Sequence, residues 1–260
     1  MQNKKITLLL STALITGVAM LLHPMLAAAQ SVELPRTTSG VPDFNGMWLR
    51  APGTASSFDP NAASYDEQEP PYTPEFMQMY KDRLAARARG EPSDDPTASC
   101  LPAGLVRLYN LILPSEIVQA DKMMMWGMEW NADNIRIYLD GRDWPEDLYP
   151  TYNGFSRGTW DGDTLVIETR ALRGDTLLDS SGAPHTDQLT VSSRLRFLDR
   201  DTLENEITLT DPGALTQPWT EARKYVRAPA DYRILEYICL ENNRNPIGAD
   251  GQIQTILEGN

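Results

Sequence analysis

From about residue 111 to residue 241, the sequence is a succession of short segments rich in β-branched and aromatic residues, each ended by turn-forming residues. The connections are mostly too short for the crossover helices that parallel strands require, so the segments must pair largely as an antiparallel meander. A sheet with this many strands tends to close into a barrel or fold into a sandwich, and the chain is therefore predicted to be mainly β. The predicted strands are EIVQA, MMMWGMEW, IRIYLDG, GFSRGTW, TLVIETR, LTVSSRLRFL, TLENEITLT, TEARKYVR and YRILEYICL.

Two neighbouring segments, LTVSSRLRFL and TLENEITLT, can be placed in register from their apolar residues. Matching the two apolar faces places Arg196 opposite Glu204 on the outer face. It also places Arg194 opposite Glu206, and each such pair contributes about 0.2–1 kcal/mol.

The same alternation predicts polar side chains on the inner face. It points Ser193 and Asn205 inward and, extended toward the N-terminus, it also points His185 and Asp187 inward. Inward polar groups cost free energy unless they find partners or water, so they favour a cavity with a partly polar lining.

Two later segments show the same mixture of apolar and polar residues on one face. In PWTEARKYVR, Trp219 and Tyr225 share a face with Glu221 and Arg223. In YRILEYICL, the apolar face carries Glu236. Three interpretations stay open: a structural ion pair that closes the barrel end, contact with a ligand, and an outward phase.

The part of the chain before these strands contains one clear helix and one short strand. Residues 30–72 read as an extended N-terminal arm that includes a turn and a strand carrying Trp48. A helix over about 74–89 is predicted from the N-cap Thr73, from Pro74 in the first turn and from Gly90 as the stop. We expect this helix to cover an opening or an edge of the sheet, within a single barrel domain of residues 73–260.

The N-terminus has the three parts of a secretory signal peptide: lysines, an apolar run and the small-residue segment LAAAQ. Residues 1–29 are therefore predicted to be removed, with a membrane anchor as the alternative, and the mature protein is predicted to be periplasmic or secreted. Its two cysteines, Cys100 and Cys239, are expected to form one disulfide, worth on the order of 4 kcal/mol. Two cysteines and one histidine are too few for a zinc site, and neither a metal nor a cofactor is predicted.

The charge of the chain restricts its partners. Without the leader, 21 basic and 36 acidic residues give a net charge of −15. Such a surface repels phosphate backbones and anionic lipids, which argues against nucleic acid or membrane surfaces as partners. The oligomeric state stays open.

The segment YLDGRDWPEDLYPTYNGFSRGTW concentrates rigid aromatic side chains and a few polar groups between two strands. Such a combination is typical of the mouth of a small-molecule pocket, although a loop that packs its aromatics on the barrel end for stability fits equally well. The predicted ligand contacts, here and on the inner face, are Tyr138, Arg142, Trp144, Tyr149, Tyr152, Ser193, Asn205, Trp219, Arg223 and Tyr225.

The usual signatures of serine hydrolases, zinc proteases, P-loop enzymes and dinucleotide oxidoreductases are missing from the sequence. The groups left for acid–base chemistry are His185 with Asp187, together with Asp140 and Glu236. A neutral imidazole near pH 7 is suited to proton transfer, and a neighbouring carboxylate could orient it.

Two resemblances to known families add to these predictions. The segment GMW, at Gly46 to Trp48, resembles the G-x-W signature of lipocalins and related calycin barrels, which implies that a basic residue on the last strand, Arg223 or Arg233, packs across the tryptophan. The mature chain also resembles a large family of exported, mostly uncharacterised bacterial proteins, through segments such as RIYLDGRDWP, GTWDGDTLVIET and PHTDQL. That resemblance implies the fold and the export but no reaction.

Two functions follow from these observations. The first is an exported, cofactor-independent enzyme, of the lyase, dehydratase, isomerase or cyclase type, acting on a small lipophilic or aromatic molecule in the barrel. The alternative is an exported, non-catalytic binding protein for a small hydrophobic ligand, because every residue named above could serve binding alone.

Overall fold

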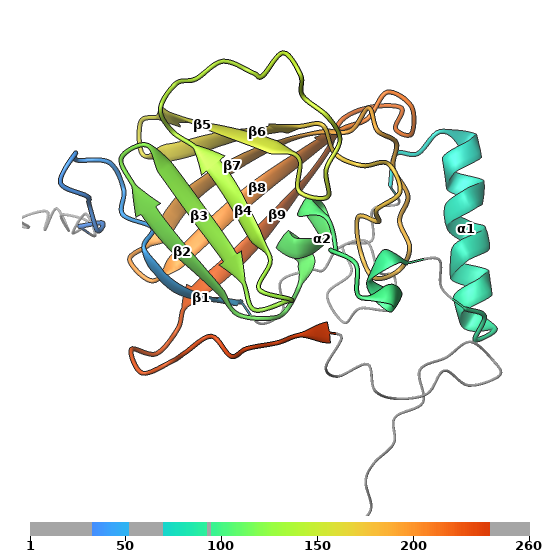
Figure 1. Ribbon diagram of the computed structural model, residues 1–260, viewed down its shortest axis with the longest axis horizontal. Helices are drawn as coiled ribbons and strands as arrows, with labels where there is room; N and C mark the ends of the chain where they lie inside the picture. The colour runs from blue at the N-terminus through green and yellow to red at the C-terminus, as the bar shows by residue number, and fades with distance from the viewer. Residues whose placement is uncertain (1–32, 52–69, 93–94, 240–260) are drawn as a thin grey trace, which may run out of the picture. The chain divides into compact units, whose positions relative to one another are not determined.

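Nine strands hydrogen-bond in sequence order and close into a barrel in the computed structural model of the protein, which describes residues 33–51, 70–92 and 95–239 (Figure 1). This confirms the predicted mainly β, barrel-type fold. The strands are β1 (Gly46–Arg50), β2 (Ser115–Ala120), β3 (Met123–Met128), β4 (Asn134–Tyr138), β5 (Phe155–Asp161), β6 (Thr164–Arg170), β7 (Thr190–Asp199), β8 (Thr202–Thr210) and β9 (Trp219–Arg227).

One neighbouring pair departs from the antiparallel pattern. Residues 139–154 leave the end of β4 and run back to the start of β5, as the yellow-green loop in Figure 1 shows. The two strands therefore pair in parallel, through Ile137–Ser156 and Tyr138–Arg157. All the other neighbouring strands are antiparallel, in agreement with the predicted, largely antiparallel meander.

The predicted register of β7 against β8 is confirmed. Arg196 lies opposite Glu204 and Arg194 opposite Glu206. The Arg196 and Glu204 side chains form an ion pair of 2.6 Å. Arg194 instead pairs with Asp161 of β5, at 2.8 Å, because β5 lies next to β6, which is the other neighbour of β7.

The barrel end at the start of β1 is closed around Trp48, which is fully buried. The guanidinium carbon of Arg227, on β9, lies 4.4 Å from the centre of a Trp48 ring. The residue that packs across the tryptophan is therefore Arg227, and the expectation of Arg223 or Arg233 is wrong. Gly46 is required beneath this contact, because a Cβ atom there would lie 2.8 Å from the Arg227 guanidinium and the residue has a φ of +132°.

At the opposite end, the predicted helix α1 (Pro74–Ala88) packs on the connection between β6 and β7. Thr73 caps the helix by accepting a hydrogen bond from the backbone N–H of Phe76, as predicted. The Tyr80 hydroxyl bonds that of Ser181 at 2.8 Å, and Arg87 donates to the carbonyl of Ser180 at 2.7 Å. The helix therefore lies against a loop that closes the barrel end.

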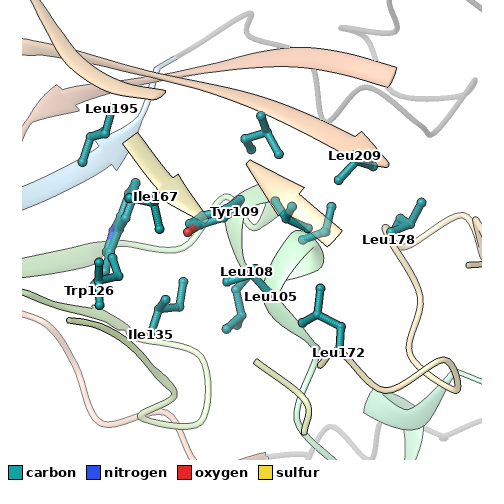
Figure 2. Packing of buried hydrophobic residues seen from close by; sticks show 14 of the residues in the cluster. Leu105, Leu108, Tyr109, Trp126, Ile135, Ile167, Leu172, Leu178, Leu195 and Leu209 are labelled. Atoms are coloured by element: carbon teal, nitrogen blue, oxygen red, sulfur yellow. The ribbon is translucent and has the colours of Figure 1, made fainter. Parts of the chain in front are cut away.

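A short helix that the sequence analysis did not predict, α2 (Leu105–Asn110), fills this end of the barrel. Figure 2 shows Leu105, Leu108 and Tyr109 projecting from α2 among side chains of the strands and of the closing loop. The apolar interior is thus largely occupied by the protein itself.

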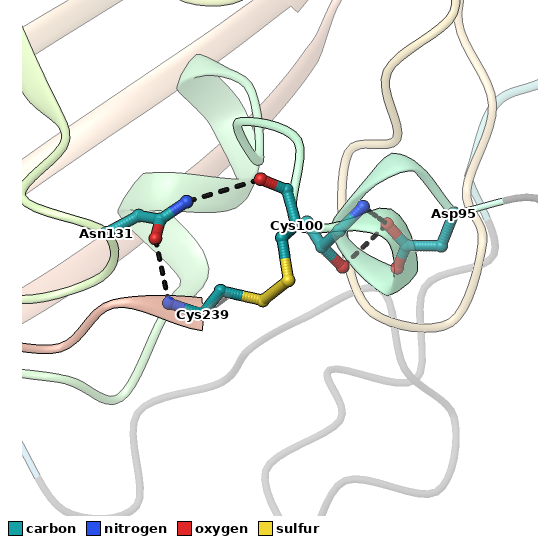
Figure 3. Close-up of a disulfide and its surroundings, with 5 residues drawn as sticks. Asp95, Cys100, Asn131 and Cys239 are labelled. Atoms are coloured by element: carbon teal, nitrogen blue, oxygen red, sulfur yellow. Dashed lines mark hydrogen bonds between the residues drawn. A yellow bond between two sulfur atoms is a disulfide. The ribbon is translucent and has the colours of Figure 1, made fainter. Parts of the chain in front are cut away.

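The disulfide between Cys100 and Cys239 is present, with 5.5 Å between the two Cα atoms (Figure 3). It follows a 3-10 helix (Pro96–Ser99) and fixes the end of the described chain to that turn. Asn131 reinforces the link, because it donates to the Cys100 carbonyl and accepts from the Cys239 N–H.

The last predicted strand, YRILEYICL, is not part of the barrel sheet. Its pairing in the described residues is an isolated bridge between Tyr237 and Trp130, whose rings stack 5.1 Å apart. The sheet offers no edge to this segment, because β1 already pairs with β9.

Candidate functional site

The inner wall of the barrel carries a group of polar side chains from β7, β8 and β9. Ser193, Asn205 and Arg223 are each no more than 1% exposed, and Trp219 and Tyr225 are each 4% exposed. The prediction that these five residues point inward is confirmed. Their contact with a ligand stays a prediction.

Arg223 is held by partners within the protein. Its Nε donates to Asn110 Oδ1 at 2.7 Å, and its Nη1 lies 3.4 Å from a carboxylate oxygen of Glu221. Burial lowers the pKa of Arg223, and the Glu221 carboxylate opposes this effect. Of the interpretations left open for Glu221 and Arg223, the structural ion pair is the one observed.

Two aromatic residues that the sequence analysis did not assign to the site complete the interior. Tyr109, on α2, and Trp126, on β3, have ring centres 5.2 Å apart, and Trp126 lies at the same distance from Tyr225. The spacing of Leu105, Leu108 and Tyr109 is that of one helix face and could have revealed α2 in the sequence.

Several buried polar atoms in this interior have no hydrogen-bond partner among the described residues. They are both amide atoms of Asn205, the hydroxyl of Tyr109 and the indole Nε1 of Trp126. Burial raises the pKa of the Tyr109 hydroxyl, and the neighbouring Ser193 side chain opposes this effect. Buried polar groups are nearly always paired in native proteins, so this cluster requires a physical explanation.

His185 is buried in the connection between β6 and β7, where both ring nitrogens are engaged. Nδ1 lies 2.8 Å from the Thr186 carbonyl, which can only accept, so Nδ1 carries the proton. Nε2 lies 2.8 Å from the Thr176 hydroxyl. Burial lowers the pKa of the imidazole, which favours its neutral form.

The carboxylates predicted to act with His185 lie elsewhere. Asp187 is exposed, and its predicted inward direction is wrong, because a turn at residues 187–188 interrupts the strand alternation before β7 begins. Glu236 is exposed and lies outside the barrel sheet, so the prediction that its side chain points into the barrel is also wrong. Asp140 is exposed in the loop after β4, where hydrogen bonds from Arg142 lower its pKa to about 2. The structure therefore does not bring the four predicted acid–base residues together.

The aromatic loop between β4 and β5 lies along the barrel wall and does not form a pocket mouth at the barrel end. Arg142 packs on Tyr138 at 3.8 Å, and Tyr138 stacks on Phe155 with 5.0 Å between the ring centres. Trp144 packs edge-on to Phe155. Two further residues predicted to contact a ligand lie outside this stack. Tyr149 is 72% exposed, and the guanidinium carbon of Arg173 lies 4.6 Å from the centre of the Tyr152 ring.

A separate pocket of about 450 Å³ opens at the end of the barrel where β1 begins. Its walls come from residues 37–45 of the N-terminal arm and from the turn after β2, and Trp160 and Leu139 form its apolar part. None of the residues predicted as site residues lines it.

Two further kinds of feature concern the described ranges: groups of metal-ligating side chains and membrane-spanning helices. Within residues 33–51, 70–92 and 95–239, no three His, Cys, Asp or Glu side chains are grouped so that they could hold a metal ion. No helix in those same ranges is both long and apolar enough to span a membrane.

The described residues form a closed, mostly antiparallel β-barrel of nine strands with few helices. No family model matches the sequence, and no curated protein matches it. Among solved structures, the chain is similar to a point mutant of the fluorescent protein UnaG, with a TM-score of 0.32 and 15% identity over 72% of this chain and 96% of that chain. Similarity this weak carries no functional argument, and the resemblance to a family of exported bacterial proteins stays a prediction.

Proposed function

We propose that this protein is an exported, non-catalytic binding protein that holds a small, mainly apolar molecule with a hydrogen-bonding group inside its barrel. The observation that carries this proposal is Asn205, which is 0% exposed and has neither amide atom paired within the described chain.

The energetic argument concerns the cost of keeping Asn205. A buried amide without partners costs about 1–3 kcal/mol, and an apolar residue of similar shape would avoid that cost. In register, Asn205 lies between Leu195 on one side and Arg223 on the other. A guest that both donates and accepts hydrogen bonds would offset the cost at this position.

The surroundings indicate what kind of guest fits. The side chains of Trp126, Ile135 and Ile167 supply apolar surface, while Asn205, Tyr109 and Ser193 supply hydrogen-bonding groups. Because α2 already fills much of the interior, the guest must be small. Ordered water is the other molecule that could satisfy these groups, and mass spectrometry distinguishes water from an organic guest.

The enzymatic alternative has less support. Acid–base catalysis needs a proton-transfer group that reaches a substrate, and the two ring nitrogens of His185 are already engaged by Thr176 and Thr186. In the described part of the chain, no carboxylate is hydrogen-bonded to the imidazole. The catalytic roles of His185, Asp187, Asp140 and Glu236 are therefore not part of this proposal.

Export rests on the predicted leader, which lies outside the described residues, and on the disulfide. Disulfides persist in oxidising compartments and are rare in the cytosol. The link between Cys100 and Cys239 supports a periplasmic or secreted location.

The proposal is tested by comparing the purified wild-type protein with the variant Asn205→Val. Native mass spectrometry, followed by organic extraction and identification of small molecules, is expected to detect a bound molecule in the wild type and none in the variant. The melting temperature of ligand-stripped Asn205→Val should be higher than that of the ligand-stripped wild type, because a costly buried amide has been removed; a gain of 1–3 kcal/mol corresponds to roughly 2–12 °C.

A matched control is Leu203→Met, a volume-conserving change on the inner face of the same strand. This variant should keep the bound molecule. If the wild type carries only water and Asn205→Val is less stable than Leu203→Met, the amide has a structural role and the proposal is wrong.

A further inference from the structure

The outer wall of the barrel carries a group of arginine and aromatic side chains around the parallel pair β4–β5. We refer to it as the cation–aromatic face. It consists of Arg136, Tyr138, Trp144, Phe155, Arg157 and Arg170.

The short pairing of β4 with β5 creates a depression on this face. The two strands share two residue pairs and then diverge toward the start of β5. The resulting pocket has a volume of about 280 Å³ and is lined by Arg136, Tyr138 and Phe155, together with Asn134 and Asn153. The Oδ1 atom of Asn153 is buried and has no hydrogen-bond partner in the described chain, so the pocket also contains an unused acceptor.

The aromatic side chains hold the arginines in place. Trp144 lies beneath two guanidinium groups, with the guanidinium carbon of Arg170 at 4.2 Å and that of Arg157 at 5.0 Å from its ring. Phe155 connects this arrangement to the pocket, because it contacts both Trp144 and Tyr138. Arginines that are positioned by stacking lose less conformational entropy when they bind a ligand.

The charge of this face is opposite to that of the chain. The sequence carries a formal net charge of −13. Yet within residues 33–51, 70–92 and 95–239, Arg136, Arg157 and Arg170 form no ion pair, although Glu168 is the cross-strand neighbour of Arg157. Acidic side chains are plentiful enough to neutralise these arginines, so the absence of such partners leaves the guanidinium groups available to an external anion.

We propose that the cation–aromatic face binds a small anion with an aromatic ring, such as an aryl carboxylate or aryl sulfonate. Arg142 and Phe155 already lie on the two faces of Tyr138, so the ring of the ligand would pack against the edges of Tyr138 and Phe155 that line the pocket. The acid group would accept hydrogen bonds from Arg136 and its neighbours in the paired geometry that guanidinium groups favour. This site lies on the outside of the barrel and does not depend on the interior site.

The experiment uses 2-naphthoate as the probe and isothermal titration calorimetry as the measurement. The wild-type protein should bind 2-naphthoate saturably, with an affinity that falls as salt is added, because the contact is between exposed charges. Acetate, which lacks the ring, and 2-naphthalenemethanol, which lacks the charge, should each bind at least about tenfold more weakly.

Two variants and two controls locate the site. Arg136→Gln and Arg170→Gln should each weaken 2-naphthoate binding by about tenfold or more. The control Arg194→Gln removes the same charge from an exposed arginine on β7, outside the face, and should change the affinity less than about twofold. Asn205→Val, inside the barrel, should bind the probe like the wild type.

Three outcomes would overturn the proposal: no saturable binding of 2-naphthoate up to about 1 mM, an equal loss of affinity in Arg194→Gln, or a loss of affinity in Asn205→Val but not in Arg136→Gln. The last result would place the probe in the barrel interior. Because the interior variant is measured separately, failure of this site and failure of the proposed function can be told apart.

Discussion

Histidine 185 illustrates how burial changes what a residue can do. In the sequence it is a conspicuous candidate base, because the only other histidine, His23, lies in the predicted leader. In the structure its Nδ1 donates to the Thr186 carbonyl and its Nε2 meets the Thr176 hydroxyl. A neutral imidazole satisfies both contacts, whereas a protonated one would be buried as a charge. The residue therefore fixes the loop that closes the barrel end.

This arrangement predicts a pH dependence of stability. Burial lowers the folded-state pKa of His185 below the unfolded value of about 6.5, so the unfolded chain binds the proton more readily. The stabilisation is complete above pH about 6.5 and is lost as the pH falls toward the folded-state pKa, with a slope of at most about 1.4 kcal/mol per pH unit. Denaturant unfolding measured between pH 7.5 and 5.5 should show this slope.

The variant His185→Gln, which cannot titrate, should be less stable at pH 7.5 and should lack that slope. A slope that is the same in the two proteins would mean that the imidazole takes up its proton equally in the folded and unfolded chains.

At the level of secondary-structure elements, α2 decides what the barrel can hold. Its six residues lie across the end of the barrel, and Asn110 links three parts of the molecule. Asn110 accepts from Arg223 of β9 and donates to the Leu178 carbonyl of the closing loop, at 2.7 and 2.9 Å. Helix, strand and loop are therefore held together by one amide side chain.

We expect Asn110→Ala to lower the free energy of unfolding by about 1.5–3 kcal/mol, because it removes a hydrogen bond from a buried guanidinium group. Denaturant unfolding measures this loss. The control Ile112→Ala, two residues further on at a side chain that is 80% exposed, should change stability by less than about 0.5 kcal/mol. A similar loss in both variants would show that the segment, and not the amide, is what stabilises the barrel end.

For the whole molecule, the disulfide is the covalent link between the turn before α2 and the last described residue. It joins residues 139 positions apart and fixes a terminal segment that makes few other contacts with the sheet. The Leu235 N–H bonds a Glu129 carboxylate oxygen, and Tyr237 stacks on Trp130, so this segment packs on the loop after β3.

The double variant Cys100→Ser with Cys239→Ser should therefore lose about 2–5 kcal/mol of unfolding free energy. Dithiothreitol should lower the midpoint of denaturant unfolding of the wild type to that of the double variant, and should leave the double variant unchanged. An unfolding midpoint of the wild type that does not respond to the reductant would contradict a stabilising role for the bridge.

Much of the barrel wall could be predicted from the sequence, because strand alternation and turn residues are local signals. The pairing of Arg196 with Glu204, the cap at Thr73 and the inward direction of Asn205 all follow from periodicity or from the chemistry of neighbouring residues. The errors occur where a local signal competes with closure of the sheet. The segment around Glu236 has a strand-like pattern, but the closed sheet has no free edge with which it could pair. Asp187 points outward because it lies in a turn, which a simple alternation of inward and outward residues does not predict.

The sequence by itself therefore determined the nine strands of the barrel, the register of β7 against β8 and the cysteines that pair, since these depend on spacing along the chain and on complementary faces. Only the tertiary structure decided what occupies the barrel, which arginine packs on Trp48 and which arginines stay unpaired beside Trp144. Those features depend on contacts between residues that are distant in sequence, and they arise only when the sheet closes and α2 enters it.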